Sequence, residues 1–393
     1  MTRWIFGLFA AIAIARVAPG QGLTVTARTC EDQEIALHDV KLTSGWKVTG
    51  TKEGATVDLA GMDLVSIEFS DKPFPNKLKG TFLRFPTGEQ LAAELLSSDD
   101  EKLRARSSLL GEFTVPLSAI EAAVLDPEYS ENITSLVRRA ADRHGDEVLL
   151  KTRDYVSGTI TGVKPDKIAL LRDDQEVFLE KARVAGIAFD PSLVDYKSTA
   201  EFHAQIRLSD GSVLNLVEIV SDGPKLSLKT GFGASLAVDA AEVVDLSFRN
   251  GRVSYLSDMK PDSAVHEPFL DDHVVPRMDR SASGTPLRMR GRVYAKGIGV
   301  RSRSELTYPL DGFVRFDAIV GLDESAGPQA SVRFRVLVDG QAAFDSGEMI
   351  ASTDPRPVQV PVRNAKRLTL VVEYESRGDV QDFADWCDAR LSR

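Results

Sequence analysis

The chain has 393 residues, too many for one ordinary hydrophobic core, so we expect about two to five domains. Its 58 acidic side chains outnumber its 48 basic ones and give a formal net charge of −10. This balance argues against nucleic acid as a partner, because phosphate binding is driven by clustered cationic charge. The two cysteines, Cys30 and Cys387, exclude a disulfide scaffold and are expected to be unpaired. With five scattered histidines they also lack the ligand spacing of a zinc site, so we expect no metal or cofactor.

The first residues predict export. A short positive segment, Met1 to Trp4, precedes the apolar run from Ile5 to Ala15, as in a secretory signal peptide. The run is too short to span a bilayer comfortably. We therefore expect residues 1–20 to be a cleaved signal peptide, with an uncleaved anchor as the alternative. The mature chain would then have no membrane span and would be secreted, periplasmic or on the cell surface.

A degenerate repeat of about 45 residues follows, and four copies are predicted at residues 23–70, 79–126, 145–190 and 200–249. The fourth copy is the clearest, because Asp210-Gly211 separates two alternating runs as a tight hairpin requires. Each copy ends on a strand, a polar turn and a short apolar strand. About five short strands in each copy predict a small SH3- or Sm-like β-barrel, formed either by each copy alone or by two copies together.

One linking helix is predicted within residues 127–144, between the second and third copies. Apolar side chains recur there at helical spacing: Ile133, Leu136, Val137 and Ala140. The pattern indicates a connector that packs on a neighbouring barrel. Asn132-Ile133-Thr134 matches a glycosylation sequon, but its place at the helix start favours capping by Asn132.

Residues 250–393 show the period-two alternation of half-buried antiparallel strands and predict a β-sandwich. Two motifs lie near its ends. They are Y-A-K-G-I-G-V-R-S-R-S at Tyr294–Ser304 and G-D-V-Q-D-F-A-D-W-C-D-A at Gly378–Ala389. Together with Pro286-Leu-Arg-Met-Arg-Gly, Val320-Gly-Leu-Asp and Val336-Leu-Val-Asp-Gly, they make this region resemble the NPCBM family of carbohydrate-binding modules.

That resemblance implies a galactose-binding-like jelly roll, so the fold class we expect is all-β: tandem small barrels, one linking helix and a jelly-roll sandwich. It also implies a glycan ligand. Two positions depart from the family pattern. Arg301 stands where family members usually carry a histidine after Gly-Ile-Gly-Val, and Phe383 stands where histidine is common before Ala-Asp-Trp.

The candidate ligand-binding residues come from both motifs: Tyr294, Lys296, Arg301, Asp382, Asp385 and Trp386. Trp386 offers either a stacking face for a sugar or a core side chain, and its small neighbours favour the core. No nucleophile elbow, zinc-protease helix, P-loop or dinucleotide fingerprint is present in the sequence. We therefore expect a binding protein and not an enzyme.

A further expectation concerns charge. In one strand, Arg288, Arg290 and Arg292 would share a face and form a guanidinium row suited to sulfate or carboxylate groups. The alternative is a solvated face with scattered acidic partners. If the row binds, the glycan is an anionic polysaccharide. The alternative function is a structural or assembly protein of the cell surface, in which the β-domains contact cell-envelope proteins.

Overall fold

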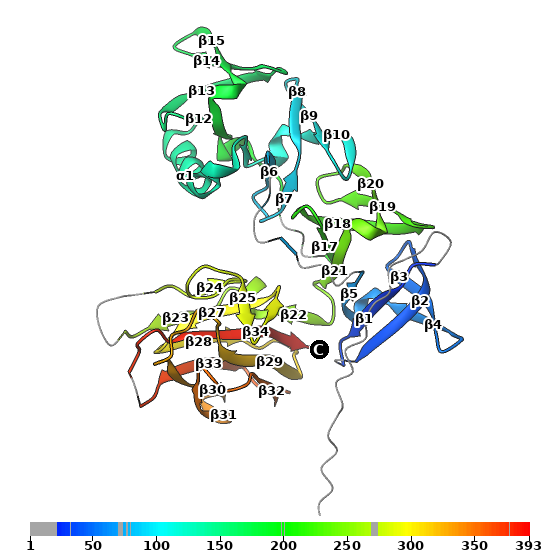
Figure 1. Ribbon diagram of the computed structural model, residues 1–393, viewed down its shortest axis with the longest axis vertical. Coiled ribbons are helices and arrows are strands. Elements are labelled where there is room, and N and C mark those ends of the chain that lie inside the picture. The colour runs from blue at the N-terminus through cyan, green and yellow to red at the C-terminus, as the bar shows by residue number, and fades with distance from the viewer. Residues whose placement is uncertain are drawn as a thin grey trace, which may run out of the picture. The chain divides into compact units, whose positions relative to one another are not determined.

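The computed structural model describes residues 22–31, 33–69, 74–75, 78, 80–197, 199, 201–268, 274–376 and 378–393. The predicted signal peptide lies outside these residues. No helix within the described ranges has the length and apolarity needed to cross a membrane. The chain divides into two compact units, residues 1–249 and 250–393 (Figure 1), which are described separately.

Four repeats with one strand order make up the N-terminal unit. The first comprises β1 (Val25–Thr29), β2 (Glu34–Thr43), β3 (Lys47–Lys52), β4 (Ala55–Ala60), a 3₁₀ turn (Gly61–Asp63) and β5 (Leu64–Glu68). β1 pairs with β2 and with β5, and β3 pairs with β2 and with β4, all antiparallel. The chain therefore runs as a four-strand meander, and its fifth strand returns to the first.

The other three repeats follow the same order, except that two short strands, β7 and β8, take the place of the second strand in the second repeat. The second comprises β6 (Phe82–Arg84), β7 (Gln90–Ala92), β8 (Glu94–Ser98), β9 (Lys102–Ser107), β10 (Gly111–Pro116) and β11 (Ala122–Val124). The third comprises β12 (Asp146–Leu150), β13 (Tyr155–Val163), β14 (Lys167–Arg172), β15 (Gln175–Glu180) and β16 (Val184–Ala188). The fourth comprises β17 (His203–Leu208), β18 (Val213–Asp222), β19 (Lys225–Thr230), β20 (Ser235–Asp239) and β21 (Val243–Arg249). In each, the last strand pairs with the first.

The last strands also join the repeats in pairs. β5 of the first repeat pairs with β21 of the fourth, with Ile67 opposite Leu246, and β11 of the second pairs with β16 of the third, with Ala123 opposite Ile187. Among the described strands, no ladder joins the fourth strand of a repeat to its fifth, so the closed barrels we expected are not found. The reason is that each fifth strand already has a partner on both edges. One core runs through all four repeats and includes Leu37, Leu95, Ile168 and Leu226.

The predicted helix is α1 (Ile133–Arg143), preceded by a 3₁₀ turn (Pro127–Asn132). Ile133, Leu136 and Ala140 are buried, and the helix packs on β11, β12 and β16, so it is a connector that covers neighbouring strands. The expected cap is wrong, because Asn132 makes no capping hydrogen bond. Asp126 caps the 3₁₀ turn instead, and its Oδ1 accepts from the backbone N–H of Glu128 at 3.1 Å.

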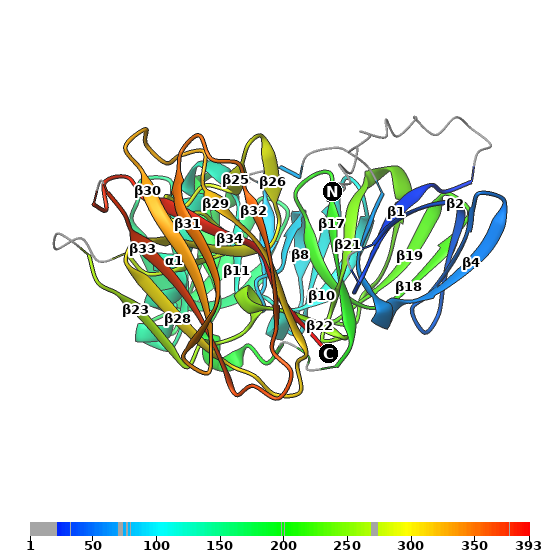
Figure 2. The same ribbon diagram turned by 90° about the horizontal axis from the view of Figure 1, so that it is seen from below.

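The C-terminal unit is a sandwich of two antiparallel sheets, whose layers are visible in Figure 2. The first sheet runs β24 (Arg277–Met278), β27 (Gly297–Arg301), β34 (Phe383–Ser392), β29 (Arg315–Leu322) and β32 (Arg356–Pro361), and β22 (Val253–Tyr255) also pairs with β34. The second runs β23 (Ser263–His266), β28 (Ser304–Pro309), β33 (Arg367–Tyr374), β30 (Ser331–Val338) and β31 (Gln341–Ile350). A short hairpin of β25 (Leu287–Met289) and β26 (Arg292–Tyr294) is separate.

The core of the sandwich lies around Trp386, which is fully buried. Its ring meets that of Phe334 edge-on at a centroid distance of 5.2 Å and lies 6.4 Å from that of Phe316. The nearly all-β fold with one α-helix in the described chain is as predicted. Cys30 and Cys387 are both buried, one in each unit, and no disulfide joins them.

Candidate functional site

The two sequence motifs lie on neighbouring strands. β27 and β34 pair antiparallel, with Ile298 opposite Trp386 and Arg301 opposite Phe383. Since alternate residues of a strand face opposite sides, Ile298 and Trp386 point into the sandwich, while Gly299, Arg301 and Phe383 belong to its outer face. The motifs therefore share one stretch of sheet, but their side chains divide between core and surface.

Backbone atoms crowd both glycines of the first motif: those of a covering loop at Gly299 and those of β34 at Gly297. A Cβ on Gly299 would lie 2.3 Å from the carbonyl oxygen of Arg280, and one on Gly297 would lie 2.5 Å from the carbonyl oxygen of Trp386. Both obstacles are backbone atoms, which cannot rotate away. Only glycine thus fits at these two positions, and at Gly299 it lets the loop pack directly on the sheet.

Five of the six candidate ligand residues are buried. The exposed fractions are 7% for Tyr294, 6% for Lys296 and 0% for Asp382, Asp385 and Trp386. Trp386 lies in the core, which is the alternative that its small neighbours favoured, and leaves no ring face for a sugar. Arg301 is half-buried.

Lys296 is held by carboxylates. Its Nζ lies 2.6 Å from Oδ1 of Asp258 and 2.5 Å from Oδ2 of Asp279. Asp279 also accepts from the backbone N–H of Gly297 at 3.1 Å. The buried ammonium thus fixes the loop that covers the sheet, because a buried charge is stable only when it is paired.

The second motif contains two buried aspartates, Asp382 and Asp385. Asp382 accepts from the hydroxyl of Ser302 at 2.7 Å and from the backbone N–H of Ser331 at 2.8 Å, and burial raises its pKa. Burial, and next the charge of Asp323, raise the pKa of Asp385 well above its usual range. Asp323 accepts from the backbone N–H of Arg288 at 3.0 Å. Asp382 and Asp323 thus hold loops together beneath the surface, whereas the two carboxyl oxygens of Asp385 are buried without a hydrogen-bond partner among the described residues.

Arg301 has a cationic neighbour that the sequence did not reveal. β24 pairs with β27 so that Arg277 lies opposite Gly299, two positions from Arg301. Residues at such diagonal positions share a face, with Cα atoms typically about 7–8 Å apart. The guanidinium of Arg301 lies 5.8 Å from the ring centroid of Phe383, which is itself partly exposed. We name Arg277, Arg301 and Phe383 the outer-face patch.

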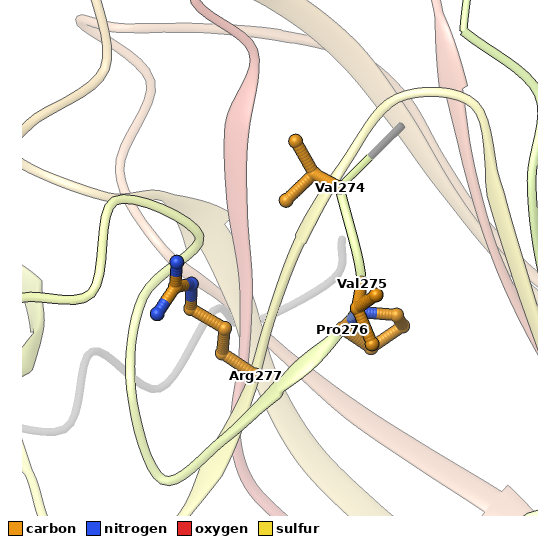
Figure 3. A pocket seen from close by; sticks show the side chains of 4 residues that line it. All are labelled: Val274, Val275, Pro276 and Arg277. Atoms are coloured by element: carbon orange, nitrogen blue, oxygen red, sulfur yellow. The ribbon is translucent and has the colours of Figure 1, made fainter. Parts of the chain in front are cut away.

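An open hollow of about 510 Å³ adjoins this patch, lined by Val274, Val275, Pro276 and Arg277. Figure 3 shows Arg277 and Val274 extending to the same side of the segment, away from Pro276. The guanidinium lies against the turn at Gly284, where a Cβ would be 3.3 Å from Nη1 of Arg277.

The same turn carries exposed hydroxyls. Ser283 Oγ lies 3.0 Å from Thr285 Oγ1 and 3.0 Å from Ser325 Oγ. Guanidinium groups, hydroxyls and one aromatic ring therefore occur together on this face. Such groups bind sugar hydroxyls and oxyanions.

The expected guanidinium row is wrong. Arg290 and Gly291 form the turn between β25 and β26, with φ of 49° and 78°, so the three arginines do not share a strand. Arg288 lies opposite Val293, which puts Arg292 on the other face of the hairpin. Arg288 lies 3.8 Å from Glu324 and Arg290 lies 3.3 Å from Asp354, so the alternative of scattered acidic partners is confirmed.

Arg277 was missed because it belongs to neither motif. Nothing near it in the sequence marks it as functional, and only its pairing with Gly299 brings it beside Arg301. Within the described residues, no group of three or more His, Cys, Asp or Glu side chains is arranged to hold a metal ion.

The strand order defines a β-sandwich of two antiparallel sheets. Residues 252–392 match the NPCBM/NEW2 domain, and this unit of the chain is an NPCBM/NEW2 domain.

Curated and solved proteins are similar to parts of the chain. Alpha-1,3-galactosidase B of Akkermansia muciniphila is 30% identical over 116 residues, which cover 28% of this chain and 15% of that protein. The solved CBM51 from Clostridium perfringens GH95 in complex with methyl-galactose is 32% identical to the matched part of this chain. The match covers 36% of this chain and 99% of the CBM51 chain, with a TM-score of 0.33. The CBM51-2 and INT domains of Clostridium perfringens ZmpB are 29% identical and cover 44% of this chain and 37% of theirs, with a TM-score of 0.34.

Proposed function

We propose that this chain is an exported, non-catalytic binding protein whose C-terminal unit binds a glycan. The match of residues 252–392 to the NPCBM/NEW2 domain carries this proposal. It is supported by the name of the Akkermansia relative, an enzyme named for an action on galactosides, although the match covers only 15% of that protein. The activity of the whole Akkermansia protein is not part of this proposal, because the two chains share only a small part of that protein's length.

The ligand contacts we propose are those of the outer-face patch. Of the six candidate residues, Arg301 is the one with an accessible side chain, and Arg277 and Phe383 extend its surface. Tyr294, Lys296, Asp382, Asp385 and Trp386 act indirectly in this proposal, by holding the sheet and loop in place. The hollow beside Arg277 has a volume in the range of small-molecule sites, about 300–1,000 Å³.

The glycan we propose is anionic, a sulfated or uronic polymer. Two guanidinium groups on diagonal positions suit oxyanions, which they bind through paired N–H donors. A single exposed contact of this kind contributes little in salt, but several contacts along a polymer gain by avidity. Binding should therefore weaken steeply as the salt concentration rises.

The test is binding of the full-length chain to a glycan array, followed by titration with one sulfated polymer, one uronic polymer and one neutral galactoside. Arg301→Ala and Arg277→Ala are each expected to weaken binding of the anionic polymers by about tenfold. Arg363→Ala is the matched control, because Arg363 is an exposed arginine of the same unit outside the patch. Equal binding of neutral galactosides without salt dependence would contradict the anionic preference, and no glycan binding at all would contradict the function.

A cell-surface assembly role is the second candidate. The observation that favours it is the array of repeats joined through their last strands, a construction suited to extended protein contacts. Absence of glycan binding together with retention of the chain on envelope preparations would favour this role.

A further inference from the structure

The N-terminal unit contains a hollow of about 360 Å³ beside α1, separate from the proposed glycan site. It is lined by Ser135, Arg138, Arg139, Asp142, Arg143 and Tyr155. The five helical residues recur at spacings of three and four, so they form one face of α1, which flanks the face that Leu136 and Ala140 bury. Tyr155 comes from the start of β13, which lies along β12 beneath the helix.

Two of the three arginines are held in place from below. Glu147 on β12 is fully buried and accepts from Nε of Arg139 at 2.9 Å, while Nε of Arg143 lies 3.4 Å from its other oxygen. The hydroxyl of Ser157 donates to Glu147 as well. Arg139 also lies over the ring of Tyr155, 4.5 Å from its centroid. The contacts to Glu147 use the Nε side of each guanidinium, which leaves the terminal nitrogens for another partner.

Arg138 has a different position. Its side chain is exposed, and within the described part of the chain it has no ion pair, although Asp142 follows one helical turn later. Its charge is not required to hold α1 on the sheet. Around the hollow, three guanidinium groups face two carboxylates, those of Asp142 and Glu147. A surplus of positive charge is thus fixed around a cavity in a chain whose net charge is −10.

We propose that this hollow is a second binding site, for a small oxyanion group, with Arg138 and the terminal nitrogens of Arg139 and Arg143 as donors. Arg139 and Arg143 are pre-organised by Glu147, which lowers the entropy lost on binding. Guanidinium donors suit sulfate, phosphate and carboxylate oxygens alike, because all three accept paired N–H bonds. The ligand chemistry is therefore an oxyanion, carried by a free ion or by an acidic sugar.

The experiment uses the full-length chain with Arg277→Ala and Arg301→Ala, so that the outer-face patch does not contribute. Isothermal titration with inorganic sulfate, inorganic phosphate and glucuronate, at ionic strength held constant with chloride, is expected to show saturable binding of at least one probe. The probe that binds most tightly shows whether the site prefers a tetrahedral ion or a sugar carboxylate.

The variant that decides is Arg138→Ala, which should weaken this binding by about tenfold. Arg138→Lys should be intermediate, since lysine keeps the charge but lacks the planar fork. Arg183→Ala, at an exposed arginine of the third repeat outside the hollow, should bind like the parent. Thermal unfolding checks that the variants are folded. No saturable binding, or equal binding by Arg138→Ala, would overturn the proposal, and neither result bears on the glycan site.

Discussion

In the N-terminal unit the hydrophobic core runs through four repeats, whereas in the C-terminal unit it lies between two sheets around one tryptophan. Each repeat is too short to bury a sufficient core alone, so the repeats join edge to edge through their last strands. The sandwich needs no such partner, because its two sheets cover one another. The difference indicates that stability is shared along the repeats but concentrated at a few positions in the sandwich.

The two units also differ in the role of their buried ion pairs. In the sandwich, Lys296 is buried between two carboxylates and supports the loop over the sheet. In the N-terminal unit, the buried carboxylate of Glu147 supports exposed arginines around a hollow. A buried ion pair thus stabilises structure in one unit and prepares a surface in the other.

Trp386→Ala should have the largest effect. Removing a fully buried tryptophan leaves a cavity between the rings of Phe316 and Phe334, and we expect a loss of about 3–5 kcal/mol in the free energy of unfolding of the C-terminal unit. Urea denaturation of the full chain, followed by circular dichroism and by proteolysis with peptide mapping, measures it. Trp46→Ala is the counterpart in the N-terminal unit and should cost less, since Trp46 is only partly buried. Equal shifts of both units in either variant would contradict independent cores.

Gly299→Ala should come next. The new methyl group would meet the backbone of residues 280–282, and overpacking of this kind costs about 1–3 kcal/mol. Gly162→Ala on β13 is the control, because nothing lies within 4 Å of its Cβ position, and we expect no loss of stability and a gain of up to about 1 kcal/mol. The same denaturation curves apply. A neutral Gly299→Ala would mean that the covering loop is not packed on the sheet.

A smaller effect is expected from pH. The raised pKa of Asp385 means that the folded state binds its proton more tightly than the unfolded state does. The stability of the C-terminal unit should therefore fall as the pH rises above the ordinary value of 3.8 toward neutrality. Asp385→Asn should flatten this dependence, whereas Asp311→Asn, at an exposed aspartate, should leave it unchanged. An identical slope in Asp385→Asn would show that other groups cause it.

Capping of the helical connector should give the smallest effect. Asp126→Ala removes the hydrogen bond to the N–H of Glu128 and should cost about 1 kcal/mol, while Asn132→Ala should change stability by less than about 0.5 kcal/mol. Thermal unfolding of the N-terminal unit compares the two. A larger loss of stability in Asn132→Ala than in Asp126→Ala would support the cap by Asn132 that the sequence predicted.

Local pattern was enough to predict much of this fold. Period-two alternation identified the strands, the Asp210-Gly211 turn separated the two strands of a hairpin, and helical spacing identified α1. These patterns depend on residues that are close in the sequence, so they can be recognised without knowledge of tertiary contacts. The burial of Trp386 followed from its small neighbours in the same way.

The site was less accessible to such reasoning. A motif marks residues that a family shares, but it does not tell which of them support the fold and which contact a ligand, and five of the six candidates are buried. The six residues from Leu287 to Arg292 show a second limit. Their alternating pattern fits a single strand as well as it fits a hairpin, and in the structure Arg290 and Gly291 form the turn of a hairpin.

By itself, the sequence determined the all-β class, the linking helix and the resemblance of residues 250–393 to the NPCBM family, because each depends on periodicity or on a contiguous motif. Tertiary structure alone decided that β5 pairs with β21 instead of closing a barrel, and that Arg277 lies beside Arg301. Alternation specifies the faces of a strand, but either edge can accept a partner from anywhere in the chain. Which partner is chosen depends on packing between distant segments.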